Sequence, residues 1–154
     1  MRLRKQTHPS APLPTYRLTD GNTPVSYTHL LAHKTGAQFD IPHGRCNAIL
    51  LPYVIEYNAR AVPERMADIA RALGLAGATS HQLTNSLVEA IKELNKKLGI
   101  KQSYCENGVS EENFLKVADF IAENATADPC TGSNPRATDT AAMRKILDLS
   151  LIHI

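Results

Sequence analysis

Residues 41–58 read IPHGRCNAILLPYVIEYN, and this stretch decides the fold class because a Pro-His-Gly turn leads directly into a long apolar segment. The segment from Ala48 to Ile55 contains no charged side chain. Its flanks and length favour a buried helix that is kinked or restarted near Pro52, although periodicity alone also allows a strand. We expect Asp40–Gly44 to form the turn in front of it.

Helical signals continue on both sides of this stretch. Capping and stop residues predict further helices from Leu30 toward Gly36, from Pro63 to Gly74, from Thr79 or Ser80 to Gly99, from Ser110 to Asp128, and from Thr138 or Asp139 past Leu147. The expected apolar faces are Met66, Ile69, Ala70 and Leu73; Leu83, Leu87, Ile91, Leu94 and Leu98; Phe114, Val117, Ala118 and Ile121; and Met143, Ile146 and Leu147. Residues 1–24 have loop composition. The sequence therefore predicts an all-α fold.

Composition narrows the function classes. The chain has 154 residues, 43% of them hydrophobic and 21% charged, with a formal net charge of +2, which is typical of one ordinary globular domain. The chain has no strong excess of charge of one sign that would indicate nucleic-acid binding. No apolar run is long enough to span a membrane. Cysteines 46, 105 and 130 are scattered without a CxxC, which indicates a reducing compartment, and we expect a cytoplasmic protein.

Three of the six histidines lie close together in the sequence. His29 and His33 are four residues apart and share one face of a helix, and the turn before His43 can fold its ring back toward that helix. Neutral imidazoles at this spacing can bind Fe, Zn, Cu or Ni. Without a Glu between them, however, spacing alone favours ordinary surface and helix-end histidines.

Several segments, in this order, resemble the iron-containing (group III) alcohol dehydrogenases. They are Ala32–Ala37, Ile41–Asn58, Ile69–Gly74, Leu94–Ile100 and Cys130–Arg136. The likeness covers about residues 31–147. Within the family, this part of the sequence is similar to the butanol dehydrogenases and to the alcohol-dehydrogenase part of the bifunctional aldehyde–alcohol dehydrogenases. It implies the C-terminal helical domain of the dehydroquinate-synthase-like architecture, which in the family follows an N-terminal nucleotide-binding α/β domain.

The resemblance also implies a site. The family holds a divalent metal, Fe²⁺ or in some members Zn²⁺, with one Asp and three His, and two of these ligand positions fall on His29 and His43. His33 matches the histidine beside the nicotinamide that assists proton transfer, so it is both the expected catalytic and the expected cofactor-binding residue. A Lewis acid polarises the alcohol oxygen while hydride leaves for the nicotinamide. Arg45 and Asn47 are assigned to helix start and packing, and Cys130 to a buried position.

The activity that the resemblance implies is NAD- or NADP-dependent interconversion of a small primary alcohol and its aldehyde, in a parent enzyme expected to be a homo-oligomer. The same scaffold also fits a glycerol dehydrogenase or a lactaldehyde or phosphonate reductase, and a third alternative is a non-catalytic helical interaction module. No glycine-rich phosphate turn or pair of adjacent glycines occurs in the sequence. The resemblance implies that the nucleotide-binding domain and two of the metal ligands, the Asp and one His, lie upstream of the matched residues. We therefore expect this fragment to be inactive by itself.

The two ends differ from the family. Val25–Leu30 and Leu149–Ile154 can both be translated, in two reading frames, from CTGTCTCTTATACACATCT, the end sequence of a transposon used to prepare sequencing libraries. We therefore expect residues 1–30 to be a disordered, non-native leader, residues 31–148 the helical metal-binding domain, and residues 149–154 a non-native tail. His29 falls both on a ligand position and inside the leader, so its origin stays open at this point.

Overall fold

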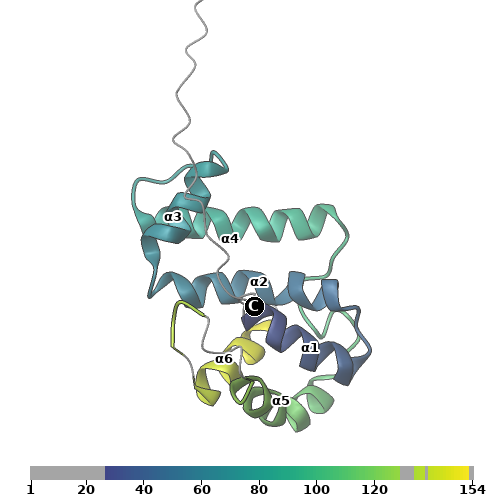
Figure 1. The fold of residues 1–154 in the computed structure, drawn as a ribbon. Coiled ribbons are helices and arrows are strands. Elements are labelled where there is room, and N and C mark those ends of the chain that lie inside the picture. The colour runs from purple at the N-terminus through teal and green to yellow at the C-terminus, as the bar shows by residue number, and fades with distance from the viewer. Residues whose placement is uncertain (1–26, 129–133, 138, 153–154) are drawn as a thin grey trace, which may run out of the picture.

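The computed structural model describes residues 27–128, 134–137 and 139–152. These residues form six α-helices, and none of them lies in a β-strand, which confirms the all-α prediction (Figure 1). The helices are α1 (Tyr27–Phe39), α2 (His43–Ala59), α3 (Pro63–Ala72), α4 (Ser80–Lys97), α5 (Glu111–Thr126) and α6 (Thr140–Leu151). The loop expected over residues 1–24, Cys130, and most of the Cys130–Arg136 motif lie outside the described residues.

Helix α2 is the central element, with α1 and α6 packed on one side and α3 and α4 on the other (Figure 1). It is one helix that continues through Pro52, so the alternative of a strand is wrong and no restart occurs. Proline inside a helix costs about 3 kcal/mol. The flanking side chains of Ile49, Leu50 and Val54 are all at least 97% buried, and their packing holds both halves of the helix in place.

Two apolar clusters follow from this arrangement. The larger one joins α1, α2, α5 and α6 and includes Tyr104 and Val109 from the connection between α4 and α5. The smaller one joins α3 and α4 through Ala67, Ala70 and Leu83. Both clusters reach α2, the larger one through Ile49 and Leu50 and the smaller one through Ile55, so α2 is packed on two sides. Among the described residues, no helix combines the length and the apolar character needed to cross a membrane.

The predicted apolar face of α3 is wrong in part. Ile69 and Leu73 are 47% and 63% exposed, and the buried residues of this helix are Ala67 and Ala70. Ala67 and Ala70 pack in one cluster with Leu83 and Leu87 of α4, and the larger Ile69 and Leu73 side chains lie outside that cluster. The sequence pattern therefore locates the apolar face of α3 approximately. It does not predict which residues of that face contact α4.

The stripe predicted for α4 is only half covered. Leu83 and Leu87 are buried, whereas Leu94 and Leu98 are 54% and 64% exposed. Helix α3 is shorter than α4 and contacts only its first part (Figure 1). The second part of the stripe therefore remains on the surface of this chain.

Helices α1 and α6 extend beyond residues 31–148, the bounds expected for the helical domain. Helix α1 begins at Tyr27, and α6 ends at Leu151. Tyr27 is only 1% exposed and donates a hydrogen bond from its hydroxyl to the carbonyl of Arg136, 3.1 Å away. Leu151 accepts a hydrogen bond from the backbone N–H of Cys105. Residues 27–30 are thus helical rather than disordered because their apolar side chains complete the core, and the foreign origin of the two ends stays a prediction from the sequence.

Three helix starts agree with the capping residues in the sequence. The side chains of Thr79, Ser110 and Asp139 accept hydrogen bonds from backbone N–H groups in the first turns of α4, α5 and α6. Each satisfies a donor that has no partner inside its helix.

Replacing Gly77 with alanine is expected to destabilise the fold. A Cβ at this position would lie 2.8 Å from the backbone nitrogen of Leu83 and 2.9 Å from its Cγ, so α4 would have to move. We expect a loss of about 1–3 kcal/mol, which urea unfolding followed by circular dichroism would measure. The control is Gly44→Ala, where an added Cβ meets nothing within 4 Å. Equal midpoints for the two variants would contradict the prediction.

Candidate metal centre

Helix α1 presents two imidazoles on its outer side. Leu30 and Leu31 are buried against the core, and His29 and His33, one turn apart, are exposed. Because residues four apart lie above one another on a helix, the two rings are neighbours, with centroids 5.4 Å apart.

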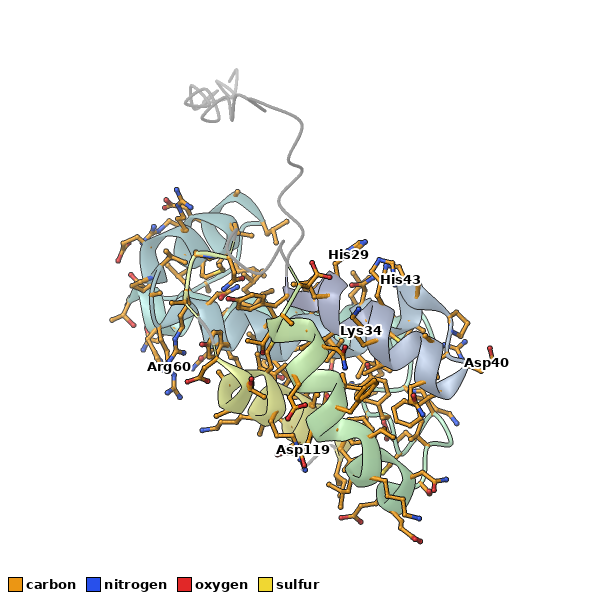
Figure 2. The ribbon with its side chains drawn as sticks, turned by 60° about the horizontal axis from the view of Figure 1, so that its bottom comes forward. His29, Lys34, Asp40, His43, Arg60 and Asp119 are labelled. Atoms are coloured by element: carbon orange, nitrogen blue, oxygen red, sulfur yellow. The ribbon has the colours of Figure 1, made fainter. Side chains whose placement is uncertain are left out.

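A tight turn brings the third imidazole to the same place. The N–H of Ile41 donates to the carbonyl of Gly36 over 3.3 Å, and a Cβ on Gly36 would approach the Ile41 carbonyl oxygen to 3.0 Å. Asp40 adopts a positive φ of 51°, a conformation that Asp tolerates better than most residues. Helix α2 therefore starts close beside α1, and its first residue, His43, turns toward His29 and His33 (Figure 2 labels His29 and His43 on the same edge of the molecule).

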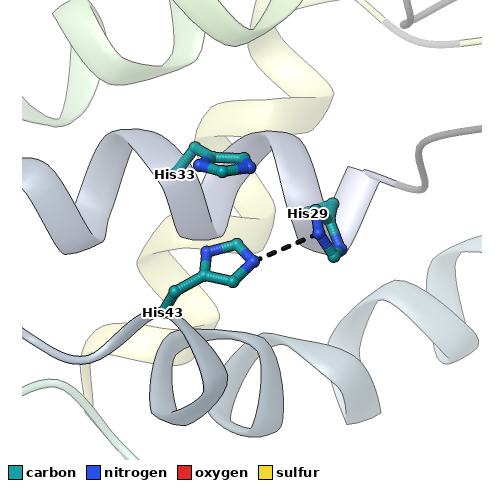
Figure 3. A group of neighbouring side chains, drawn as sticks. All are labelled: His29, His33 and His43. Carbon is teal, nitrogen blue, oxygen red and sulfur yellow. Dashed lines mark hydrogen bonds between the residues drawn. The ribbon is translucent and has the colours of Figure 1, made fainter.

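The three rings form one compact cluster. The Nε2 atoms of His29 and His43 are 3.2 Å apart, and one nitrogen from each of the three rings lies within 4.8 Å of the others. Figure 3 shows the His43 ring beside both α1 histidines; its centroid lies 4.3 Å from that of His33 and 4.6 Å from that of His29. An ion with two imidazole ligands at about 2.1 Å in tetrahedral geometry holds their nitrogens about 3.4 Å apart. The spacing of His29 and His43 fits that requirement.

The electrostatics of the cluster favour the neutral form of the His43 ring. Desolvation, followed by repulsion from His33 and His29, lowers the pKa of His43. A neutral imidazole has a lone pair for a cation, and an imidazolium has none. The Nδ1 atom of His43 is buried and has no hydrogen-bond partner among the described residues.

Two neighbouring residues assigned to helix start and packing have different surroundings. Arg45 is exposed. Asn47 is half-buried, and its Nδ2 lies 2.8 Å from Nε2 of His43 and 3.2 Å from the His43 carbonyl oxygen. This contact with a candidate ligand was not predicted from the sequence, although the four-residue spacing of His43 and Asn47 on one helix was available as a signal. The structure thus brings His29, His33 and His43 together and adds Asn47 beside them.

Comparison with known proteins gives consistent matches. Residues 17–151 match the model of the Fe-containing alcohol dehydrogenase family, C-terminal. The chain is 47% identical over 127 residues to the NADPH-dependent butanol dehydrogenase of Clostridium saccharobutylicum, a match that covers 82% of this chain and 33% of that protein. It is 37% identical over 143 residues to the bifunctional aldehyde-alcohol dehydrogenase of Escherichia coli K12, covering 82% of this chain and 16% of that protein. A solved structure of 1,3-propanediol oxidoreductase aligns with a TM-score of 0.75 and 34% identity, covering 82% of this chain and 33% of the other.

Proposed function

This chain belongs to the Fe-containing alcohol dehydrogenase family, and on that premise we propose that it is the metal-binding helical part of an NAD(P)-dependent alcohol dehydrogenase. The reaction is interconversion of a small primary alcohol and its aldehyde. The observation that carries the proposal is the convergence of His29, His33 and His43 at the junction of α1 and α2. The chain spans 33% of the length of the butanol dehydrogenase relative, so the activity belongs to the longer enzyme.

The donor set fits a divalent first-row metal, Fe²⁺ or Zn²⁺. His29 and His43 would hold it through Nε2, since these atoms have the separation that two ligands of one ion require. When bound, the ion supplies Lewis-acid polarisation of the alcohol oxygen. His33 lies within the cluster and is exposed, and we assign it the proton that leaves the alcohol hydroxyl, together with a contact to the nicotinamide.

The remaining assignments rest on the relatives. The name of the butanol dehydrogenase specifies NADPH, which supports a nicotinamide dinucleotide as the hydride acceptor. Because a dinucleotide site needs a glycine-rich phosphate turn, which this sequence lacks, we expect no turnover by this chain alone. Cys46 and Cys105 are free thiols, which supports a reducing, cytoplasmic location. A homo-oligomeric parent enzyme is part of the same proposal.

The test of the proposed function uses Co²⁺ as a visible probe of coordination. Titration of this chain should give d–d absorption bands that saturate at one equivalent, and Zn²⁺ and Fe²⁺ should displace the Co²⁺. Absence of saturable binding would contradict the metal centre. A non-catalytic interaction module predicts that outcome.

The activity is tested in the full-length parent enzyme with a panel of aldehydes, the ketone dihydroxyacetone, and either NADH or NADPH. Turnover of simple primary aldehydes supports the proposal. Preference for dihydroxyacetone, lactaldehyde or a phosphonate aldehyde would assign the same scaffold to a glycerol dehydrogenase, lactaldehyde reductase or phosphonate reductase instead. Aldehyde reduction by the purified fragment would contradict our expectation that it is inactive.

A further inference from the structure

Asn47 contacts the imidazole of His43 through an amide whose orientation the structure fixes. Its Nδ2 lies 3.2 Å from the backbone carbonyl oxygen of His43. A carbonyl oxygen only accepts hydrogen bonds, so the atom facing it must be the amide nitrogen and not the amide oxygen. The same nitrogen lies 2.8 Å from Nε2 of His43 and therefore donates to that atom as well.

This contact determines where the proton of a neutral His43 sits. A nitrogen that accepts a hydrogen bond has its lone pair free, so Nε2 has no hydrogen and the proton is on Nδ1. Nε2 is also the atom that lies 3.2 Å from Nε2 of His29. The lone pair consequently sits at the position where the proposed metal centre needs a ligand.

The rest of the environment opposes this tautomer. Nδ1 is buried and has no partner among the described residues, so a proton there has no acceptor. With the proton on Nε2 instead, His43 would donate a hydrogen bond to Nε2 of His29. The buried Nδ1 atom would then carry only a lone pair without a donor. Without the Asn47 amide, the second arrangement is favoured.

We propose that Asn47 is a positioning residue that fixes the tautomer of His43 by donating to Nε2, and that it yields this lone pair when a divalent cation binds. The proposal rests on the proposed metal centre for its second half only. Its first half concerns the metal-free chain, so the two can fail separately.

The chain contains a matched pair for comparison. On α4, Asn85 follows His81 by four residues, and its Nδ2 lies 3.4 Å from Nδ1 of that histidine. Both residues are exposed and remote in sequence from the cluster. Asn85→Leu therefore removes a similar amide without touching His43, and it serves as the control.

The experiment is long-range ¹H–¹⁵N correlation of the imidazoles in the metal-free chain at about pH 8, above the usual histidine pKa. His43→Gln identifies the His43 signals by their loss. We expect the Nδ1–H pattern for His43 in the wild type and in Asn85→Leu, and the Nε2–H pattern in Asn47→Leu. An Nε2–H pattern in the wild type, or an unchanged pattern in Asn47→Leu, would overturn the proposal. Asn47→Ala replaces Asn47→Leu if the larger side chain prevents folding, and the wild-type spectrum decides the first half without any variant.

Addition of Zn²⁺ to the wild type tests the second half. The side-chain amide resonances of Asn47 should shift with saturation because their acceptor is taken, while those of Asn85 stay in place. Zn²⁺ binding with an unchanged Asn47 amide would overturn the displacement. No Zn²⁺ binding at all would contradict the proposed function and the displacement while leaving the tautomer assignment as measured.

Discussion

We expect the replacement of His43 with glutamine to lower the Zn²⁺ affinity of this chain by at least about a hundredfold, because it would remove a proposed ligand outright and loss of a supporting partner alone costs 10–100-fold. His43 is the central ring of the cluster. Its centroid lies closer to the centroids of His29 and His33 than these two lie to each other. Glutamine keeps a polar side chain but has no imidazole nitrogen. Chelator competition measures the change.

The controls for this prediction separate ligands from neighbours. His81→Gln changes an exposed imidazole on α4, outside the cluster, and should leave the affinity unchanged. His29→Gln should cause a loss as large as that of His43→Gln, because the two Nε2 atoms are 3.2 Å apart. His33→Gln should lower affinity less than tenfold if this residue handles a proton rather than the metal. A larger loss of Zn²⁺ affinity for His33→Gln than for His29→Gln would mean that His33 is a ligand in place of His29. Equal affinities in all four variants would contradict the proposed metal centre.

The sequence predicted most of the helical framework because its signals are local. Thr79, Ser110 and Asp139 cap helices wherever the chain places them, since each side chain bonds to an N–H three residues later. Gly74 and Gly99 end helices with positive φ values of 73° and 70°. Such signals need no knowledge of the rest of the fold.

The failed predictions concern contacts between distant segments. Whether Leu73 is buried depends on which side of α3 meets α4. Whether α1 starts at Leu30 or at Tyr27 depends on a carbonyl of Arg136, more than a hundred positions away. The continuity of α2 through Pro52 likewise depends on burial on both sides. Local helix propensity contains no information on such contacts between distant segments.

In the candidate metal centre, some features likewise follow from local spacing and others depend on the folded structure. The pairing of His29 with His33 follows from helical spacing alone. The approach of His43 required a turn whose geometry depends on the contact between Gly36 and Ile41, and the sequence indicated only that such a turn was possible. Asn47 was available from spacing, but its donation to Nε2 depends on the rotamers of two side chains. Tautomer and lone-pair direction are properties of the folded site.

The larger core should respond strongly to the loss of Phe114, a fully buried residue of α5. Its ring stacks on Phe39, the last residue of α1, with centroids 5.4 Å apart and an angle of 11°, and it also contacts Tyr104 at 5.3 Å. We expect Phe114→Ala to lower the free energy of unfolding by about 3–5 kcal/mol, through lost burial and the cavity left behind. Urea unfolding gives the value from the midpoint and slope.

A second phenylalanine on the same helix provides the control. Phe120 is 63% exposed, so Phe120→Ala should change stability by less than about 0.5 kcal/mol. Similar losses in both variants would contradict the described core. Because Phe39 ends the helix that carries His29 and His33, the Phe114 cavity should also loosen the histidine cluster, and saturating Zn²⁺ should recover part of the lost stability by binding only the folded state. Recovery in Phe114→Ala that disappears in Phe114→Ala/His43→Gln would link the core of this domain to its metal centre.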